Sequence, residues 1–317
     1  MQIISNTTDF SLKGPSAIAI GKFDGIHVGH QKLMEQILAE KKNGMRAVVF
    51  TFDPSPEELF SGKRLPVLDT TQEKRERFAK MGIDDLIEFP LNFQTASISP
   101  MDFMERFLLM QLKAGLVVSG SDLSFGDKGK GNAGMLADFA KEHGFAYRMI
   151  DKVCVEGKEV SSSRVRNAVA AGNMEEAAKL LGTPYSVSGR IIHGNHIGHT
   201  LQMPTVNMIP PAFKLLPPRG VYATVSKTPK GIYSGITNIG YKPTVSDEKA
   251  LGVETYLYDF DGNLYDEEVH TKLLHFMRPE QKFDGVEELM SQLQKDKENG
   301  KKLFHQIEAG TLTVFDK

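Results

Sequence analysis

The fold of the first half of this chain is decided by the stretch Gly21-Lys22-Phe23-Asp24-Gly25-Ile26-His27-Val28-Gly29-His30. An apolar run over residues 17–20 precedes it, and a helix-like segment follows from residue 31. This order of strand, glycine-rich turn and helix places backbone N–H groups and a helix N-terminus where they can bind a phosphate. The stretch lacks the spacing Gly-x-x-x-x-Gly-Lys-Ser/Thr, so it is not a P-loop.

Two histidines, His27 and His30, stand at the predicted start of this helix. Their imidazole N–H groups can donate to one phosphoryl group, and Gly29 lets that group approach the backbone. Two such donors favour nucleotidyl transfer, in which an enzyme positions ATP and stabilises charge without a covalent intermediate. The alternative is that both histidines lie on an exposed helix start and bind nothing.

A second polar run, Ser161-Ser162-Ser163-Arg164-Val165-Arg166, begins a short predicted helix that Gly172 closes. Serines are common helix N-caps, and this is one interpretation of the run. A capping run does not need arginines in its first turn, however. Hydroxyl groups, free N–H groups and guanidinium groups together favour a site for the β- and γ-phosphates that leave as pyrophosphate.

Short apolar segments alternate with helical patterns in the first half of the chain. Predicted strands cover residues 17–20, 47–52, 86–89, 116–119 and 146–150, and predicted helices include 71–81, 100–113 and 133–143. Gly82 and Gly144 suit helix C-termini. The alternation predicts an α/β, doubly wound, Rossmann-like domain. Ligands of such sheets bind at the carboxyl ends of the strands, where the histidine turn falls.

The pattern changes after Gly182-Thr183-Pro184 to short strands separated by turns. Predicted strands cover residues 185–192, 220–227, 231–239, 253–260 and 269–276, which favours a closed antiparallel β-barrel. Apolar residues at helical spacing over 286–299 predict a terminal helix that packs on the barrel. The predicted division is an α/β domain over 1–183, a β-barrel domain with its helix over 184–306, and a tail over 307–317.

Composition limits the classes of partner. The 38 Lys and Arg balance 40 Asp and Glu, so we expect no nucleic-acid partner and no membrane partner. No apolar run reaches about 18 residues, and the N-terminus lacks the features of a signal peptide, which predicts a cytoplasmic protein. The single cysteine, Cys154, lies in an apolar run and is predicted to be buried.

Four motifs in order resemble those of the prokaryotic riboflavin kinase/FMN adenylyltransferases, the bifunctional FAD synthetases, over roughly residues 15 to 300. The histidine stretch and the serine–arginine stretch are similar to that family's two adenylyltransferase signatures. Between them, residues 50–56 resemble a segment that usually carries His where Ser55 stands. Residues 120–126 resemble a loop at the nucleotide and flavin site, with Leu123 in place of a usual Phe.

This resemblance implies transfer of AMP from ATP to FMN, which yields FAD and pyrophosphate. It implies catalytic roles for His27 and His30. The residues implied to contact the flavin in this half are Phe52, Pro56 and Phe125. The residues implied to bind nucleotide or phosphate are Gly21, Phe23, Asp24, Gly25, Gly29, Asp122, Ser161, Ser162, Ser163, Arg164 and Arg166, with Gly194 and Gly198 in the barrel.

The barrel resembles a riboflavin kinase because residues 194–207 keep the sequence Pro-Thr-x-Asn. The resemblance implies that Thr205 and Asn207 hold Mg²⁺ and the ATP phosphates, and that Glu254 takes the proton of the ribityl 5′-hydroxyl. The residues implied to border the flavin here are Arg278 and Phe283. From the residues alone, Pro-Thr is also typical of a strand-turn, and Glu254 could equally be an outward-facing charge.

The barrel also departs from the family. His199 stands where Arg is usual, Gln202-Met203 where Gly-Phe is usual, and Val206 where Ala is usual. Glutamine adds bulk beside a phosphate, and histidine is only partly charged near neutral pH. We therefore predict a riboflavin kinase that is slow or inactive beside the adenylyltransferase.

Two alternatives remain for the barrel, a fully active kinase and a non-catalytic flavin-binding module. The intact histidine motif argues against a purely regulatory flavin-binding protein. The implied cofactor is Mg²⁺, and ATP, FMN, FAD and riboflavin are the implied substrates or products. We expect a monomer or a weak homo-oligomer.

Overall fold

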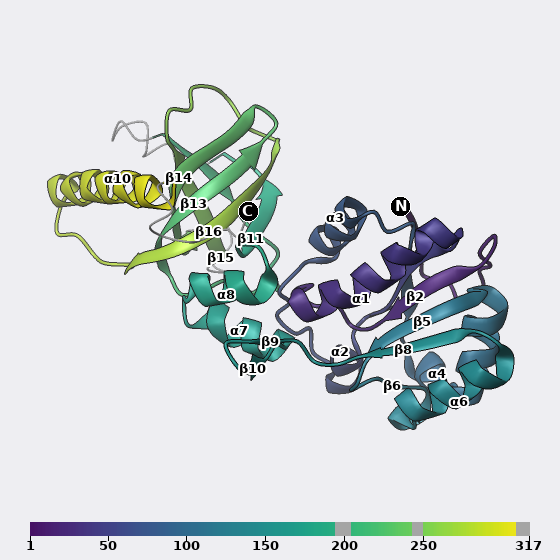
Figure 1. Ribbon diagram of the computed structural model, residues 1–317. Coiled ribbons are helices and arrows are strands. Elements are labelled where there is room, and N and C mark those ends of the chain that lie inside the picture. The colour runs from purple at the N-terminus through teal and green to yellow at the C-terminus, as the bar shows by residue number, and fades with distance from the viewer. Residues whose placement is uncertain (194–203, 243–249, 309–317) are drawn as a thin grey trace. The chain divides into compact units, whose positions relative to one another are not determined.

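The computed structural model describes residues 1–193, 204–242 and 250–308. The chain divides into two compact units, Met1–Ser161 and Ser162–Lys317 (Figure 1). The first unit is an α/β domain and the second contains two short helices, an antiparallel sheet and a long helix.

Six parallel strands form the sheet of the first unit, in the order β1-β4-β3-β2-β5-β8. Their bounds are β1 Gln2–Ser5, β2 Ser16–Ile20, β3 Arg46–Asp53, β4 Asp85–Pro90, β5 Ala114–Gly120 and β8 Ala146–Ile150. The chain passes from β2 through β3 to β4 in one direction, and then returns to β5 on the other side of β2. This reversal creates a topological switch point at the carboxyl ends of β2 and β5.

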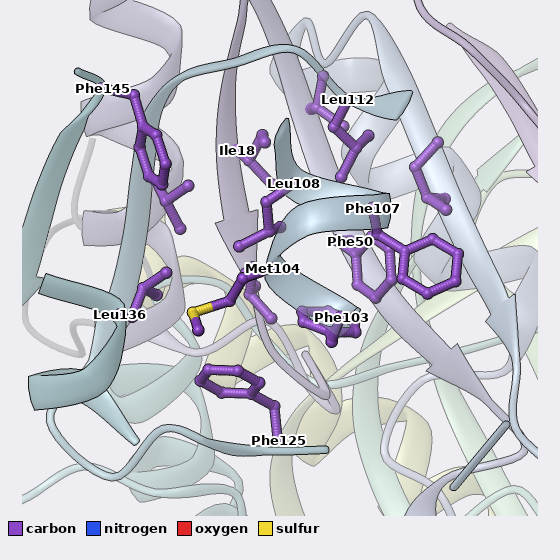
Figure 2. Close-up of a cluster of buried hydrophobic side chains, with 14 of the residues drawn as sticks. Ile18, Phe50, Phe103, Met104, Phe107, Leu108, Leu112, Phe125, Leu136 and Phe145 are labelled. Atoms are coloured by element: carbon purple, nitrogen blue, oxygen red, sulfur yellow. The ribbon is translucent and has the colours of Figure 1, made fainter. Parts of the chain in front are cut away.

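Helices cover both faces of this sheet, which confirms the doubly wound prediction (Figure 1). Ala17 and Ala19 of β2 face a core that contains residues of α1 and α3, whereas Ile18 and Ile20 face a core with residues of η2 and α6 (Figure 2). The helices of this unit are α1 Val28–Ala39, η1 Glu40–Asn43, α2 Pro56–Ser61, α3 Thr71–Met81, α4 Phe93–Ala96, α5 Pro100–Asp102, η2 Phe103–Gln111, η3 Asp127–Gly129 and α6 Ala133–His143.

Several local features differ from the sequence predictions. The helix predicted over 100–113 begins as α5 but continues as a π-helix, η2, which ends where the Leu112 N–H donates to the Phe107 carbonyl at 2.8 Å. Strand β8 lies at the sheet edge and is largely exposed rather than buried. The prediction of a buried Cys154 is wrong, because this residue lies exposed in the hairpin of β9 Cys154–Val155 and β10 Lys158–Glu159.

The second unit begins with two helices, α7 Ser162–Ala170 and α8 Met174–Leu181. Six antiparallel strands follow, in the order β11-β16-β13-β14-β15-β12. Their bounds are β11 Ser186–Arg190, β12 Thr205–Met208, β13 Gly220–Thr228, β14 Gly231–Lys242, β15 Ala250–Leu257 and β16 Glu268–Pro279. A bridge between Ile192 and Asn207, with an N–H···O distance of 2.8 Å, links the two ends of this order and confirms a closed barrel.

The terminal helix, α10 Val286–Glu308, packs on β13 and β14 as predicted, and it extends nine residues beyond the predicted end at residue 299. Gly300 faces the barrel at the closest point of contact. A Cβ atom there would lie 2.3 Å from the Tyr258 hydroxyl and 2.8 Å from Cγ2 of Ile236. The Tyr258 hydroxyl donates to the Lys297 carbonyl at 2.8 Å, which fixes the ring beneath the helix.

Replacing Gly300 with Ala should destabilise the barrel, although alanine favours a helix interior by about 1 kcal/mol. The clash with Tyr258 and Ile236 displaces α10, and such overpacking costs about 1–3 kcal/mol. Thermal and urea unfolding of Gly300→Ala check this, with the exposed neighbour Asn299→Ala as the control. An increase in stability for both variants would contradict the close contact.

Candidate active sites

The turn between β2 and α1 has a strained backbone that buried side chains hold in place. Phe23 has a φ of 51° and Ile26 a φ of 34°, both in the region that disfavours side chains. Both side chains are fully buried in the core beneath α1. At its start, the turn is fixed by the Gly21 N–H, which donates to the Phe50 carbonyl at 3.1 Å. Burial of two large apolar groups therefore offsets the strain of the turn.

Two glycines of the motif make room for the protein's own rings. A Cβ atom at Gly21 would lie 2.9 Å from the Phe23 ring, and one at Gly29 would lie 3.2 Å from the His27 ring. Packing inside the turn therefore favours glycine at both positions, in addition to any approach of a ligand to the backbone.

The two histidines form a stacked pair at the start of α1. His27 is the N-cap, and its Nδ1 accepts the backbone N–H of His30 at 3.3 Å. Because Nδ1 is the acceptor, the proton of the neutral ring is on Nε2, which can donate to a ligand. The ring centroids of His27 and His30 lie 3.7 Å apart, and Phe23 meets the His30 ring edge-on at 5.2 Å. His27 is buried and His30 half-buried, so the alternative of an exposed helix start is wrong.

Both imidazoles are neutral at physiological pH. Burial lowers the pKa of His27 to about 4; the positive charge of Arg77 also acts downward, whereas a backbone hydrogen bond and the Asp122 carboxylate act upward. Burial, together with His27, Arg77 and Lys74, lowers the pKa of His30 well below its usual value. The Nδ1 atom of His30 is buried without a hydrogen-bond partner among the described residues. The pair therefore presents N–H dipoles rather than positive charge.

Asp122 follows β5 and lies close enough to influence His27, so the switch point brings these two residues together. A Cβ atom at Gly120 would lie 2.9 Å from Oδ1 of Asp122, which explains the glycine that ends the strand. Phe125 of the same loop is buried in the core, with its ring 5.3 Å from that of Phe103 (Figure 2).

Phe52, near the end of β3, is half-buried and meets the rings of Phe50 and Phe89 edge-on. Pro56 is the first residue of α2, and Ser55 caps that helix in a capping box with Glu58. The serine that replaces the family's usual histidine therefore has a local structural role. Its signal, Ser-x-x-Glu before a helix, is readable in the sequence.

Asp24 is also engaged by the protein. Its Oδ1 accepts the backbone N–H groups of Leu68 at 2.9 Å and Asp69 at 3.3 Å, in the segment that leads into α3. Arg77 of α3 contacts the same turn and was not predicted from the sequence, since no motif marks it.

In the serine–arginine run, the serines lie at the start of α7 and Arg164 forms an ion pair. Ser161 directly precedes α7, and Ser162 and Ser163 are its first two residues. Arg164 donates through Nε and Nη2 to Oε1 of Glu176, at 3.0 and 2.5 Å, and so joins α7 to α8. Arg166 is half-buried on α7.

The barrel brings Thr205, Asn207 and Glu254 together on one face. Asn207 and Glu254 are direct partners in the ladder of β12 and β15. The Thr205 hydroxyl donates to Oε1 of Glu254 at 2.5 Å. The Oδ1 atom of Asn207 is buried and has no hydrogen-bond partner among the described residues. Such an unsatisfied oxygen costs about 1–3 kcal/mol unless a ligand or ion meets it.

Comparison with known families supports both halves. Residues 10–164 match a family described as FAD synthetase, and residues 181–304 match one described as riboflavin kinase. A Listeria monocytogenes bifunctional riboflavin kinase/FMN adenylyltransferase is 37% identical, over 95% of this chain and 96% of that protein.

The chain belongs to the family of bifunctional riboflavin kinase/FMN adenylyltransferases.

Other relatives agree. The Bacillus subtilis family member is 32% identical over 92% of this chain and 93% of its own length. A crystal structure from Streptococcus pneumoniae, described as a macrolide-efflux protein, is 29% identical with a TM-score of 0.84, over 94% of this chain and 98% of that one. Among the described residues, no helix combines the length and the apolar character needed to cross a membrane.

The structure also describes Arg278 and Phe283, the two residues that the family resemblance implies border the flavin in the barrel. Arg278, at the end of β16, pairs through Nε and Nη2 with the buried Asp296 of α10, at 2.9 and 2.6 Å. Phe283 is half-buried in the segment before α10. Gly194 and Gly198, and the departures His199, Gln202 and Met203, lie outside the described residues.

The histidine pair predicts a distinct titration. The His27 signal in ¹H–¹³C NMR should titrate at about pH 4, with assignment by His27→Ala. His275, whose pKa the Glu175 carboxylate raises, should titrate at higher pH and serves as the internal control. Because the unfolded chain binds the His27 proton at about pH 6.5, the free energy of unfolding should fall as the pH drops from about 6.5 toward 4. Ordinary titration of His27 near pH 6.5 would contradict its burial.

Proposed function

We propose that the first unit transfers AMP from ATP to FMN, with His27 and His30 at the α-phosphate. An oxygen of the FMN phosphate forms a bond to the α-phosphorus, and the bond from that phosphorus to the α–β bridging oxygen breaks, which releases pyrophosphate. The stacked, neutral imidazole pair at the switch point is the observation that supports this assignment. The Nε2–H of His27 is fixed before the substrate arrives, and it would donate to the oxygen on which negative charge increases.

We also propose that the N-terminus of α7, with its serines and Arg166, binds a phosphate group. Backbone N–H groups at a helix start favour anions, and Ser161 to Ser163 occupy that start. Arg164 is better assigned to joining α7 with α8, because Glu176 already binds its guanidinium group. The compact units divide at 161/162, so α7 and α8 lie in the second unit, whereas the functional boundary that we propose is 183/184.

For the barrel, we propose phosphorylation of riboflavin at its 5′-hydroxyl. Glu254 would accept the hydroxyl proton, and Thr205 orients that carboxylate by its hydrogen bond. The residues present suit Mg²⁺, because the buried, unpartnered Oδ1 of Asn207 and the Thr205 oxygen are the hard donors that this ion prefers. When bound, Mg²⁺ would neutralise charge on the ATP phosphates. The alternative of a non-catalytic flavin-binding barrel leaves the pairing of Thr205 with Glu254 without a role.

Removal of one imidazole tests the adenylyltransferase assignment. His30→Ala should lower the rate of FAD formation from FMN and ATP by about 10²–10³-fold, since one preorganised donor is lost. Chromatographic separation of FMN and FAD provides the measurement. His143→Ala, at the exposed end of α6, is the matched control. Undiminished synthesis by the His30 variant would place the histidines away from the reacting phosphate.

The barrel assignment makes a separate prediction. Glu254→Gln should reduce FMN formation from riboflavin by about 10²–10⁴-fold and leave FAD formation from FMN unchanged. In the unaltered protein, FMN formation should be slower than FAD formation, because Gln202 and His199 replace a glycine and a permanent cation. Equal rates of the two reactions would show that these replacements are tolerated.

A further inference from the structure

Arg77 of α3 binds the backbone immediately before the catalytic histidine. Its Nη1 donates to the Gly25 carbonyl at 2.9 Å, and its Nη2 donates to the Ile26 carbonyl at 3.1 Å. Nη1 also donates to Oδ2 of Asp69 at 2.7 Å. One guanidinium group thus holds three oxygen atoms at once, and two of them belong to the residues that position His27.

Of these two residues, Ile26 needs such support. Gly25 has a φ of 83° and Ile26 a φ of 34°, and a side-chain residue in this region costs about 1–3 kcal/mol unless its surroundings hold it. Gln31 supplies one further bond, from Nε2 to the Ile26 carbonyl at 2.9 Å. A small change in the direction of these peptide groups would rotate the whole His27 side chain.

A second set of contacts joins the turn to the segment before α3. The Asp24 carboxylate accepts the N–H groups of Leu68 and Asp69, while Arg77 bridges the Asp69 carboxylate to the carbonyls of the turn. The Asp24 carboxylate, as an acceptor, therefore links the turn to the segment before α3. The Arg77 guanidinium group, as a donor, links α3 to the turn. Together the two contacts close a ring of hydrogen bonds around the start of the motif.

Arg77 acts on the histidines through its charge as well. Its positive charge lowers the pKa of both His27 and His30, in the same direction as burial. Lys74, on the same helix, also lowers the pKa of His30. At His27 the Asp122 carboxylate raises the pKa and so opposes the effect of Arg77. Asp69, Asp24 and Lys22 are the other charged groups at the turn. The two aspartates are engaged with Arg77 or with backbone N–H groups, and Lys22 pairs with Glu57.

We propose that Arg77 is a positioning residue of the adenylyltransferase: its guanidinium group fixes the carbonyls of Gly25 and Ile26, and thereby the ring of His27. This inference rests on the proposed role of the histidines in adenylyl transfer. Lysine cannot replace arginine here, because an ammonium group lacks the planar fork that reaches separate acceptors.

The test compares Arg77→Lys and Arg77→Gln in the full chain. Arg75→Lys is the matched control, since Arg75 lies on the same helix and forms a two-bond ion pair with Glu88, away from the turn. For Arg77→Lys we expect kcat for FAD formation to fall about 10- to 100-fold, the loss that a slightly misplaced catalytic group produces, with little change in the KM for FMN. Arg75→Lys should keep kcat.

Charge is tested by NMR titration of the histidines. In Arg77→Gln the signals of His27 and His30 should titrate at higher pH than in the unaltered protein, and kcat should begin to fall at a correspondingly higher pH on the acid side. In Arg77→Lys, which keeps the charge, the titration should move less. If Arg77→Gln does not fold, the comparison of Arg77→Lys with Arg75→Lys still tests positioning.

Two results would overturn the proposal. One is an unchanged kcat in Arg77→Lys. The other is a loss of activity in Arg77→Gln while the titration pH of both histidines and the pH dependence of kcat stay unchanged. Arg77 would then have a purely structural role. Absence of FAD formation by the unaltered protein would instead refute the proposed function, and the histidine titrations would still report on Arg77.

Discussion

The hydrogen bond from the His30 backbone N–H to Nδ1 of His27 is the contact on which the proposed adenylyltransferase site depends. It starts α1, since one of the free N–H groups of the first turn is satisfied by the cap. It also fixes the proton of His27 on Nε2, and so decides which ring atom can donate. A larger residue at Gly29 would crowd that ring, since a Cβ atom there would lie 3.2 Å from it. One hydrogen bond thus caps α1 and sets the tautomer of His27, so a change that breaks it affects both the helix start and the proposed donor.

Unsatisfied polar atoms mark both sites. Among the described residues, three buried side-chain atoms lack a hydrogen-bond partner, and two of these belong to motif residues, His30 and Asn207. Leaving such an atom unpaired costs about 1–3 kcal/mol, which a protein of marginal stability retains only where something else is gained. A substrate, water or ion that satisfies these atoms would recover that free energy on binding. The third atom, Oε1 of Gln111, belongs to neither motif and has no such explanation.

Much of this architecture could be predicted from local patterns, whereas contacts between distant segments could not. Alternation of apolar strands and helices predicted the doubly wound sheet, and turn spacing predicted the barrel. Strand β1 was missed because Gln2–Ser5 is short and half-exposed, so it carries little apolar signal. Strand β12 was missed because Pro-Thr suggests a turn, and only its pairing with β15 makes it a strand. Arg77 was missed because its partners lie about 50 residues away in the chain.

The arginines show what a motif resemblance determines and what it leaves to the structure. The resemblance implied ligand contacts for Arg164 and Arg278, yet each is bound to a carboxylate, Glu176 and Asp296 respectively. Asp296 is almost fully buried, and removing its partner would leave an unpaired buried charge, which typically costs about 3–5 kcal/mol. Arg278 therefore anchors α10 to the end of β16, whatever it contributes to a flavin. A ligand that recruited either guanidinium group would have to compete with an existing ion pair, so these residues are better suited to shaping their sites than to binding phosphate directly.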